Sequence, residues 1–287
     1  SQNVVIKLIA INVVVHIVSF IIIGLIGLGG RQVAVDAYNG FVSWLWLPGD
    51  IGTFITRPWT LITHFFLHTR GFSHLFWNML FLLWFGRIFQ NLMGNARTLA
   101  LYLFAGLCGG VAFMLFSQVI PIMSTSSVMA GASGAVTAIV VGAATLTPNY
   151  EIRLMFFGNI KIWWIAAFQV IADLVYLSAN NTGGHFAHLT GALVGYLYVT
   201  QLQKGTDIAD WTVNVMNFFG SAFKRSPKQP AFKVHRNERA NSNNSSKKTP
   251  FKEVSQEEID AILDKISKSG YDSLTAKEKE ILFKANK

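Results

Sequence analysis

Six apolar runs that carry few charges divide the first 203 residues of the chain. They lie at about residues 8–28, 72–93, 98–121, 131–147, 160–179 and 185–203. A helix of roughly 20 residues crosses the hydrocarbon core of a bilayer. The pattern therefore predicts an all-α, polytopic membrane protein with a six-helix bundle. The first run is too long for a cleaved signal peptide and lacks a small-residue cleavage site, so we expect it to be a true span.

The fourth run is shorter than the others. Ser133 opens it and Thr147-Pro148 closes it, which allows roughly 22 Å of helix at 1.5 Å per residue. A helix of that length does not cross the bilayer. If its C-terminal end reaches one surface, irregular backbone at its N-terminal end must line a watery cavity walled by protein. Ser133 is then expected at the floor of that cavity.

The chain changes character after residue 203. A single apolar face over residues 204–224 predicts an interfacial amphipathic helix. It is formed by Ile208, Trp211, Val215, Phe218, Phe219 and Ala222. Residues 225–254 are expected to be a flexible polar linker. Residues 255–287 carry two capping-box patterns, Ser255 with Glu258 and Thr275 with Glu278, and predict a small helical hairpin.

Composition and charge support a membrane protein. Hydrophobic residues make up 52% of the chain and charged residues 14%. Of the net charge of +9, residues 1–203 hold 8 Lys and Arg against 4 Asp and Glu, and residues 204–287 hold 16 against 11. The excess is shared by both parts, so nucleic-acid binding is not needed to explain it. The single cysteine, Cys108, excludes a disulfide framework and a thiolate metal cluster.

The distribution of basic residues predicts the orientation. Cytoplasmic connections carry an excess of Lys and Arg. The rule puts the basic tail in the cytoplasm, and six spans then put the N-terminus there too. The short connections with Arg87 and Arg97, and with Arg153 and Lys161, fall on the same side.

The first connection, about residues 29–71, is expected outside. It is rich in aromatic residues, with Phe41, Trp44, Trp46 and Trp59 among Gly, Pro and Asp. Tryptophan favours the headgroup level. The connection therefore fits either an ordinary aromatic belt or a functional lid.

Two small-residue stripes predict that the fourth and sixth runs approach closely. Gly134, Ala138 and Gly142 share one helical face, and Ala187, Gly191 and Gly195 share another. Small residues let the backbones of membrane helices come together. Such packing brings two side chains at the helix starts, those of Ser133 and His188, within reach of each other.

Ser133 and His188 suggest nucleophilic chemistry. A serine hydroxyl needs a base that also orients it, and an imidazole serves near neutral pH. Neither residue has a carboxylate nearby in sequence, so a serine–histidine dyad is more economical than a triad. Asp173, the one acidic residue deep in a predicted span, is interpreted as a structural or gate-helix residue in preference to a third member of a triad.

Acyl transfer also needs donors for the developing oxyanion. His74 and Asn78 lie four residues apart, on one face of the second run. Both polar groups are costly in a membrane unless they have partners or a function. The backbone amide of Ser133, at a helix N-terminus, is the third candidate donor.

These motifs resemble those of the rhomboid intramembrane serine proteases of the bacterial type. The pattern is His74-x-x-x-Asn78, Gly131-x-Ser133-Gly134, and Ala187-His188 followed by Gly191 and Gly195, in the family's order over roughly residues 1–203. The resemblance implies a six-span protease domain with Ser133 as nucleophile, His188 as base, and His74, Asn78 and the Ser133 amide as the oxyanion hole.

The resemblance further implies an endopeptidase that cleaves transmembrane segments near the outer face of the membrane. Its partners would be transmembrane protein substrates and the lipid bilayer, with no cofactor, no metal and no nucleic acid. It implies a multi-pass protein of the bacterial inner membrane. The partner of the C-terminal tail is not implied.

The chain departs from the family pattern at two places. Where the family often has Trp-Arg in the first external connection, this chain has Trp59-Thr60, with Arg57 just before. Gln90 stands where the family often has Glu near the end of the second span. His185 is interpreted as a residue at the start of a helix and not as part of the chemistry.

Two questions stay open from the sequence. The bulky residues Trp163, Trp164 and Phe168 in the fifth run fit either a gate for lateral access of substrate or lipid-facing filler. A non-proteolytic relative that binds transmembrane segments as a chaperone is the alternative function, although such proteins usually lose the serine or the histidine. The chain lacks the His-Glu-x-x-His motif of a metalloprotease and the second facing aspartate of an intramembrane aspartyl protease. It also shows no internal repeat of the kind that favours a transporter.

Overall fold

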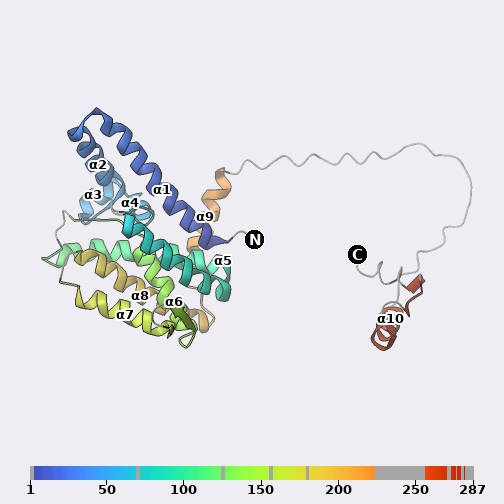
Figure 1. Ribbon diagram of the computed structural model, residues 1–287. Coiled ribbons are helices and arrows are strands. Elements are labelled where there is room, and N and C mark those ends of the chain that lie inside the picture. The colour runs from blue at the N-terminus through green and yellow to red at the C-terminus, as the bar shows by residue number, and fades with distance from the viewer. Residues whose placement is uncertain are drawn as a thin grey trace, which may run out of the picture. The chain divides into compact units, whose positions relative to one another are not determined.

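The chain folds into two compact units, Ser1–Ser226 and Pro227–Lys287. The computed structural model describes residues 3–68, 72–123, 127–154, 158–178, 181–223, 256–269, 273–275, 277–278 and 281. Its first unit is mainly helical (Figure 1). Helices occupy each of the six apolar runs. Two of them, Val4–Gly29 and Phe72–Val119, are long and apolar enough to cross a membrane.

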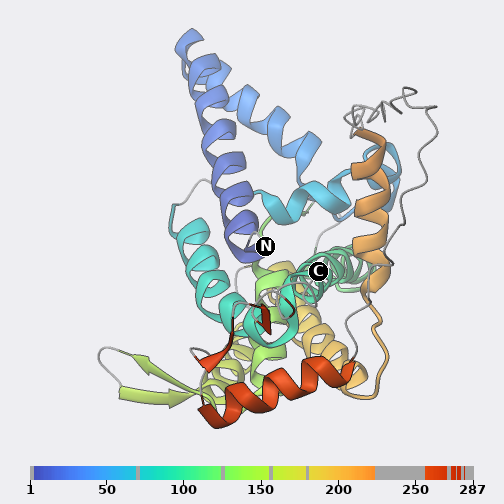
Figure 2. The ribbon, with the colours of Figure 1, turned by 90° about the vertical axis from the view of Figure 1, so that its right-hand side faces the viewer.

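Helix α1, Val4–Ile26, stands out from the first unit (Figures 1 and 2). The 3₁₀ turn η1, Gly27–Gly29, reverses the chain into α2, Arg31–Leu45, which returns beside α1. Eight apolar residues of α1 are at least 46% exposed. These are Ile11, Val14, Ile17, Val18, Ile21, Ile22, Leu25 and Ile26. An apolar surface of this extent suits contact with lipid.

The predicted external connection is folded. It contains α2, α3 (Ile51–Thr56), α4 (Thr60–Thr63) and η2 (His64–Phe66). Asp50 caps α3 by accepting the Thr53 backbone N–H across 2.6 Å, and this bond and the Thr53 hydroxyl hold the pKa of Asp50 below its usual value.

Aromatic contacts fasten this connection. Trp44 and Trp59 stack with ring centroids 5.8 Å apart, and Trp59 Nε1 donates to the Trp44 carbonyl across 2.8 Å. Arg57 covers the Trp44 ring at 4.7 Å and donates to the Ser43 carbonyl. Arg57, three residues before Thr60, therefore supplies a cation beside the two tryptophans.

Helix α5, Phe72–Val119, is broken at Gly94, where φ is +81°. The break falls between the second and third apolar runs, as predicted. Side chains beside it receive the start of α1: Gln90 Oε1 accepts the Val5 backbone N–H across 3.0 Å, and Asn95 Oδ1 accepts that of Val4 across 3.3 Å. Gln90 thus accepts a backbone N–H that has no partner within α1. This role needs a hydrogen-bond acceptor and does not need a charged side chain.

Helix α6, Ser133–Leu146, lies in the core, and ten of its residues are buried. Its 14 residues give roughly 21 Å of helix, which confirms the expected short length. Helices α7 (Ile162–Val175) and α8 (Thr182–Gln203) lie beside it (Figure 1). A Cβ on Gly191 would stand 2.1 Å from the Gly134 carbonyl oxygen, and one on Gly195 2.2 Å from that of Ala138. The two backbones therefore touch along the small-residue stripes.

Two short antiparallel strand pairs, absent from the all-α prediction, join the helices. Strand β1, Leu47–Pro48, pairs with β2, Val128–Met129. Strand β3, Glu151–Leu154, pairs with β4, Gly158–Lys161, in the connection between α6 and α7. The first pair fastens the segment that precedes Ser133 to the connection predicted to be external.

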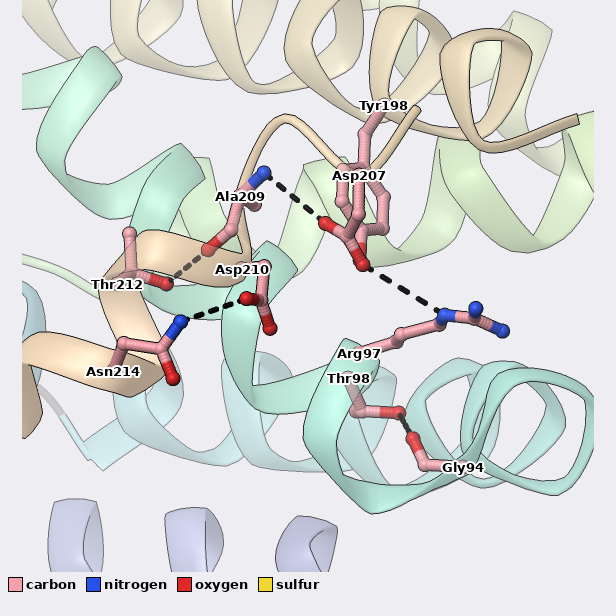
Figure 3. A network of polar contacts seen from close by, with 9 residues as sticks. All are labelled: Gly94, Arg97, Thr98, Tyr198, Asp207, Ala209, Asp210, Thr212 and Asn214. Atoms are coloured by element: carbon pink, nitrogen blue, oxygen red, sulfur yellow. Dashed lines mark hydrogen bonds and ion pairs between the residues drawn. The ribbon is translucent and has the colours of Figure 1, made fainter. Parts of the chain in front are cut away.

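Helix α9, Asp210–Phe223, is joined to the bundle through Asp207 (Figure 3). Asp207 accepts the Tyr198 hydroxyl at 3.3 Å and the Ala209 backbone N–H at 3.1 Å, and lies 3.7 Å from Nε of Arg97. The contacts link the end of α8, the second arm of α5 and the start of α9. The side chains of Phe218, Phe219 and Ala222, part of the predicted interfacial face, lie outside the described residues.

The described part of the second unit contains α10, Gln256–Ser269. The capping box of Thr275 and Glu278 forms, with the Thr275 backbone N–H donating to Glu278 across 2.7 Å. Lys265 lies 2.9 Å from Glu278, and with Thr275 it lowers the pKa of Glu278 to about 2. The predicted linker 225–254 and Ser255 lie outside the described residues, so the predicted domain boundaries stay a prediction.

Candidate active site

A cavity of about 780 Å³ opens between α5, α6, α7 and α8. Ser133, His188, His74 and Asn78, the four residues singled out for chemistry, all line it. Asp173 and Phe168 of α7 line it as well. The structure therefore brings residues from four helices, spread over more than a hundred positions of sequence, to one place.

Ser133 is held by the segment before it. The Gly49 backbone N–H donates to the Ser127 carbonyl across 2.8 Å, and the Gly131 N–H donates to the His64 carbonyl across 2.9 Å. Gly131 has φ of +148°, a conformation that glycine adopts without strain. A Cβ on Gly131 would lie 2.9 Å from Cε1 of His74 and 3.5 Å from Oγ of Ser133. The missing side chain is therefore what allows His74 and Ser133 to approach each other.

The contact between α6 and α8 relates Ser133 to His188. A Cβ on Gly134 would lie 3.1 Å from the Ala187 carbonyl oxygen. Gly134 follows Ser133 and Ala187 precedes His188, so the hydroxyl and the imidazole flank the point where the two backbones meet. His188 is partly exposed to the cavity, with 21% of its side chain accessible.

Asp173 lies against His188, which the sequence interpretation missed. Nδ1 of His188 is 2.8 Å from Oδ1 of Asp173, and Nδ1 of His185 is also 2.8 Å from that oxygen. Asp173 is only 5% exposed, and its Oδ2 has no hydrogen-bond partner among the described residues. The available signal was an acidic residue inside an apolar span, which marks a functional position by default.

His74 and Asn78 share the opposite wall of the cavity, on the first turns of α5. Asn78 Nδ2 donates to the His74 carbonyl across 2.9 Å, and Asn78 is 7% exposed. A carboxamide nitrogen carries two hydrogens, so this bond leaves one for another acceptor. The His74 ring lies edge-on to that of His68, with centroids 5.2 Å apart. The amide of Asn78 and the ring of His74 are therefore oriented by their own helix and by the turn before it.

The three aromatic residues proposed as a gate differ in position. Phe168 lines the cavity and is 74% exposed. Trp163 and Trp164 stack on each other, with centroids 3.8 Å apart, at the start of α7. Among the described residues, α7 buries Ile162, Ala166 and Asp173, and Gln169 donates to Thr137 of α6 across 2.6 Å. Few buried side chains and hydrogen bonds hold α7 to its neighbours, and the contact of Asp173 with the two histidines is among them.

The chain is similar to known proteins. The family model described as Rhomboid domain matches residues 56–204, and a family of unknown function, DUF6576, matches residues 250–284. The RHOMBOID-like protein 12, mitochondrial, of Arabidopsis thaliana is 29% identical over 161 residues, which are 52% of this chain and 48% of that protein. The chain thus spans about half the length of this curated relative.

Proposed function

Because the chain belongs to the rhomboid family, we propose that it is an intramembrane serine endopeptidase that cleaves transmembrane segments of other membrane proteins. One observation carries the proposal. Ser133 and His188 line one cavity and adjoin the contact of Gly134 with Ala187, and Nδ1 of His188 lies 2.8 Å from Oδ1 of Asp173.

In the proposed reaction, Oγ of Ser133 attacks the carbonyl carbon of the scissile peptide bond. Nε2 of His188 accepts the hydroxyl proton and later donates it to the leaving amine. Asp173 accepts the Nδ1–H of His188, which keeps the lone pair on Nε2 and stabilises the imidazolium that forms. Water in the cavity then hydrolyses the acyl-enzyme, with His188 again acting as base.

The negative charge on the tetrahedral intermediate needs donors that are already in place. Ser133 at the start of α6, Asn78 and His74 line the same cavity. The proposed donors are the Ser133 backbone N–H, the second N–H of the Asn78 amide and the His74 ring. Each such donor contributes on the order of 3 kcal/mol to the transition state. Because α5 and α6 are packed in the core, these donors require little rearrangement when charge develops.

We propose six spans, with both ends of the first unit on the cytoplasmic side and the cavity opening toward the outer face. The short helix α6 supports this arrangement, since about 21 Å of helix that ends near one surface leaves Ser133 below the other. The exposed apolar face of α1 supports a lipid-facing position for that helix. The second unit would then lie in the cytoplasm, with a regulatory or partner-binding role.

A fluorophosphonate probe tests the proposal on the detergent-solubilised protein. We expect the wild-type protein to be labelled at Ser133 and to cleave a reporter transmembrane substrate. Ser133→Ala and His188→Ala should abolish both. Ser73 also lines the cavity, so Ser73→Ala is the matched control and should keep labelling and cleavage.

Failure of a folded wild-type protein to react would contradict the enzymatic assignment. Binding of the substrate helix without cleavage would then favour the non-proteolytic alternative. Cleavage that persists in Ser133→Ala would place the nucleophile elsewhere.

A further inference from the structure

We propose that Asp173, His185 and His188 form a binding site for a divalent transition metal ion such as Zn²⁺, and that the ion inhibits the enzyme when bound. The binding site is inferred from geometry alone. The inhibition rests on the proposed function, because it requires His188 to be the base. This metal would be a regulator and not a cofactor of hydrolysis.

The three side chains already converge. Nδ1 of His185 and Nδ1 of His188 each lie 2.8 Å from Oδ1 of Asp173, and one ligand atom from each residue falls within 4.8 Å of the others. His185 and His188 are three residues apart in the first turns of α8, so their rings share one face of that helix. Asp173 reaches them from the last turn of α7.

The ligand set suits zinc better than harder cations. Zn²⁺ binds imidazole nitrogen and carboxylate oxygen at about 2.0–2.2 Å, commonly with three protein ligands and a fourth position for water. Mg²⁺ and Ca²⁺ prefer oxygen ligands. Asp173 and His188 line the cavity, so an ion can reach them from water and keep a water molecule as its fourth ligand.

The environment of Asp173 points to a cation as well. Its carboxylate is 5% exposed, and one oxygen receives both imidazoles while the other has no hydrogen-bond partner among the described residues. A buried carboxylate that is half satisfied is costly. A divalent ion that replaces the two Nδ1 protons would compensate its charge directly.

Metal binding and general-base catalysis cannot occur together on His188. A neutral imidazole has one nitrogen with a lone pair and one with a proton. If Nδ1 binds the ion, the proton must lie on Nε2, the atom that would accept the proton of Ser133. In the metal-free state Asp173 takes the Nδ1–H and leaves Nε2 free. The same carboxylate therefore serves both states, and the ion selects the inactive one.

Binding is tested first, without any activity measurement. Detergent-solubilised wild-type protein is titrated with Co²⁺, followed by its visible d–d absorption, and with Zn²⁺ by calorimetry. We expect one ion per chain. His185→Gln should weaken binding at least about tenfold, since even outer-shell changes at metal sites cost that much. His16→Gln, a histidine substitution on α1, is the matched control and should bind like wild type.

Inhibition is tested on the same proteins. Zn²⁺ should inhibit the wild type and His16→Gln, while His185→Gln, compared with its own metal-free rate, should need at least about ten times more Zn²⁺. Mg²⁺ should not inhibit any of them. Asp173→Asn and His188→Gln should also lose Co²⁺ binding. The test of the site therefore does not depend on the correct folding of a single variant.

The outcomes separate the two proposals. Absence of binding by the wild type, or equal affinity in His185→Gln and wild type, would overturn the site. Binding that depends on His185 but leaves an active enzyme uninhibited would overturn the inhibition and the role of His188 as base. A wild type without activity would contradict the proposed function, while the Co²⁺ titration would still decide the site.

Discussion

His188 lies with its Nδ1 atom 2.8 Å from Oδ1 of Asp173, although the two residues are 15 positions apart and belong to different helices. The contact joins α7, which has few buried residues, to α8, which packs against the core helix α6. In the proposed reaction this contact would fix the tautomer of His188 as the base, and Asp173 would be a third member beside the predicted serine–histidine dyad.

Asp173→Asn should lower kcat by about 10² to 10⁴ with little change in KM, because the carboxamide cannot hold Nδ1–H of His188 as the carboxylate does and favours the wrong tautomer. Turnover of a reporter transmembrane substrate measures the effect. Asp36→Asn, at an exposed position of α2, is the control and should be neutral. An unchanged kcat in Asp173→Asn would leave the carboxylate as a structural contact.

Asn78→Ala should lower kcat by about 10²–10³ while KM stays near its original value, because the lost donor acts on the oxyanion and not on the bound substrate. His74→Ala should behave in the same way. Steady-state kinetics separate the two constants. Asn39→Ala, exposed on α2, serves as control. A rise in KM alone would identify Asn78 as a substrate-binding contact.

Gly191→Ala should destabilise the protein by at least about 3 kcal/mol, the upper end of the cost of overpacking a core. The new Cβ would stand 2.1 Å from the Gly134 carbonyl oxygen, so α6 and α8 must separate. Thermal unfolding in detergent gives the stability, and probe labelling of Ser133 reports the site. Gly24→Ala is the control, since nothing lies within 4 Å of that position. Equal stability of the two variants would mean that α6 and α8 can separate without loss of folding free energy.

Phe168→Ala should accelerate cleavage of a transmembrane substrate, because a smaller side chain at the exposed edge of the cavity eases lateral access. Cleavage of a soluble peptide should change little, since it need not enter from lipid. Ile171→Ala on the same helix, 58% exposed, is the control for a lipid-facing truncation. Equal rates for both variants on both substrates would favour the filler interpretation. Trp163→Ala extends the test to the start of α7.

A chain that ends at Arg225 should cleave the reporter substrate at close to the full-length rate, because all groups of the proposed reaction lie in α5, α6, α7 and α8. The truncation removes the segment that matches the family of unknown function. Size-exclusion chromatography in detergent checks that the shortened protein is folded. A folded truncation without turnover would make the second unit part of the catalytic machinery.

Much of the helical arrangement can be predicted from the sequence alone, because it follows from local physical rules. Apolar runs in a bilayer must satisfy their own backbone hydrogen bonds, so each becomes a helix, and the break at Gly94 falls between two of them. The stripes around Gly134 and Gly191 predict a close approach because only small residues permit it. Ser133, His188, His74 and Asn78 were predicted as site residues from the sequence, and all four line one cavity. Their roles in the reaction stay a prediction.

The partner of His188 was decided by tertiary structure alone. Asp173 meets His185 and His188 because α7 and α8 are oriented by packing and by the connection between them, and neither is encoded in a short sequence pattern. The same holds for the pairing of Leu47 with Met129, which lie 82 positions apart in sequence and steady the segment before Ser133. Helix periodicity is local and can be read along the chain. The contacts of Asp173 with His185 and His188 depend on the relative placement of whole helices, which only folding fixes.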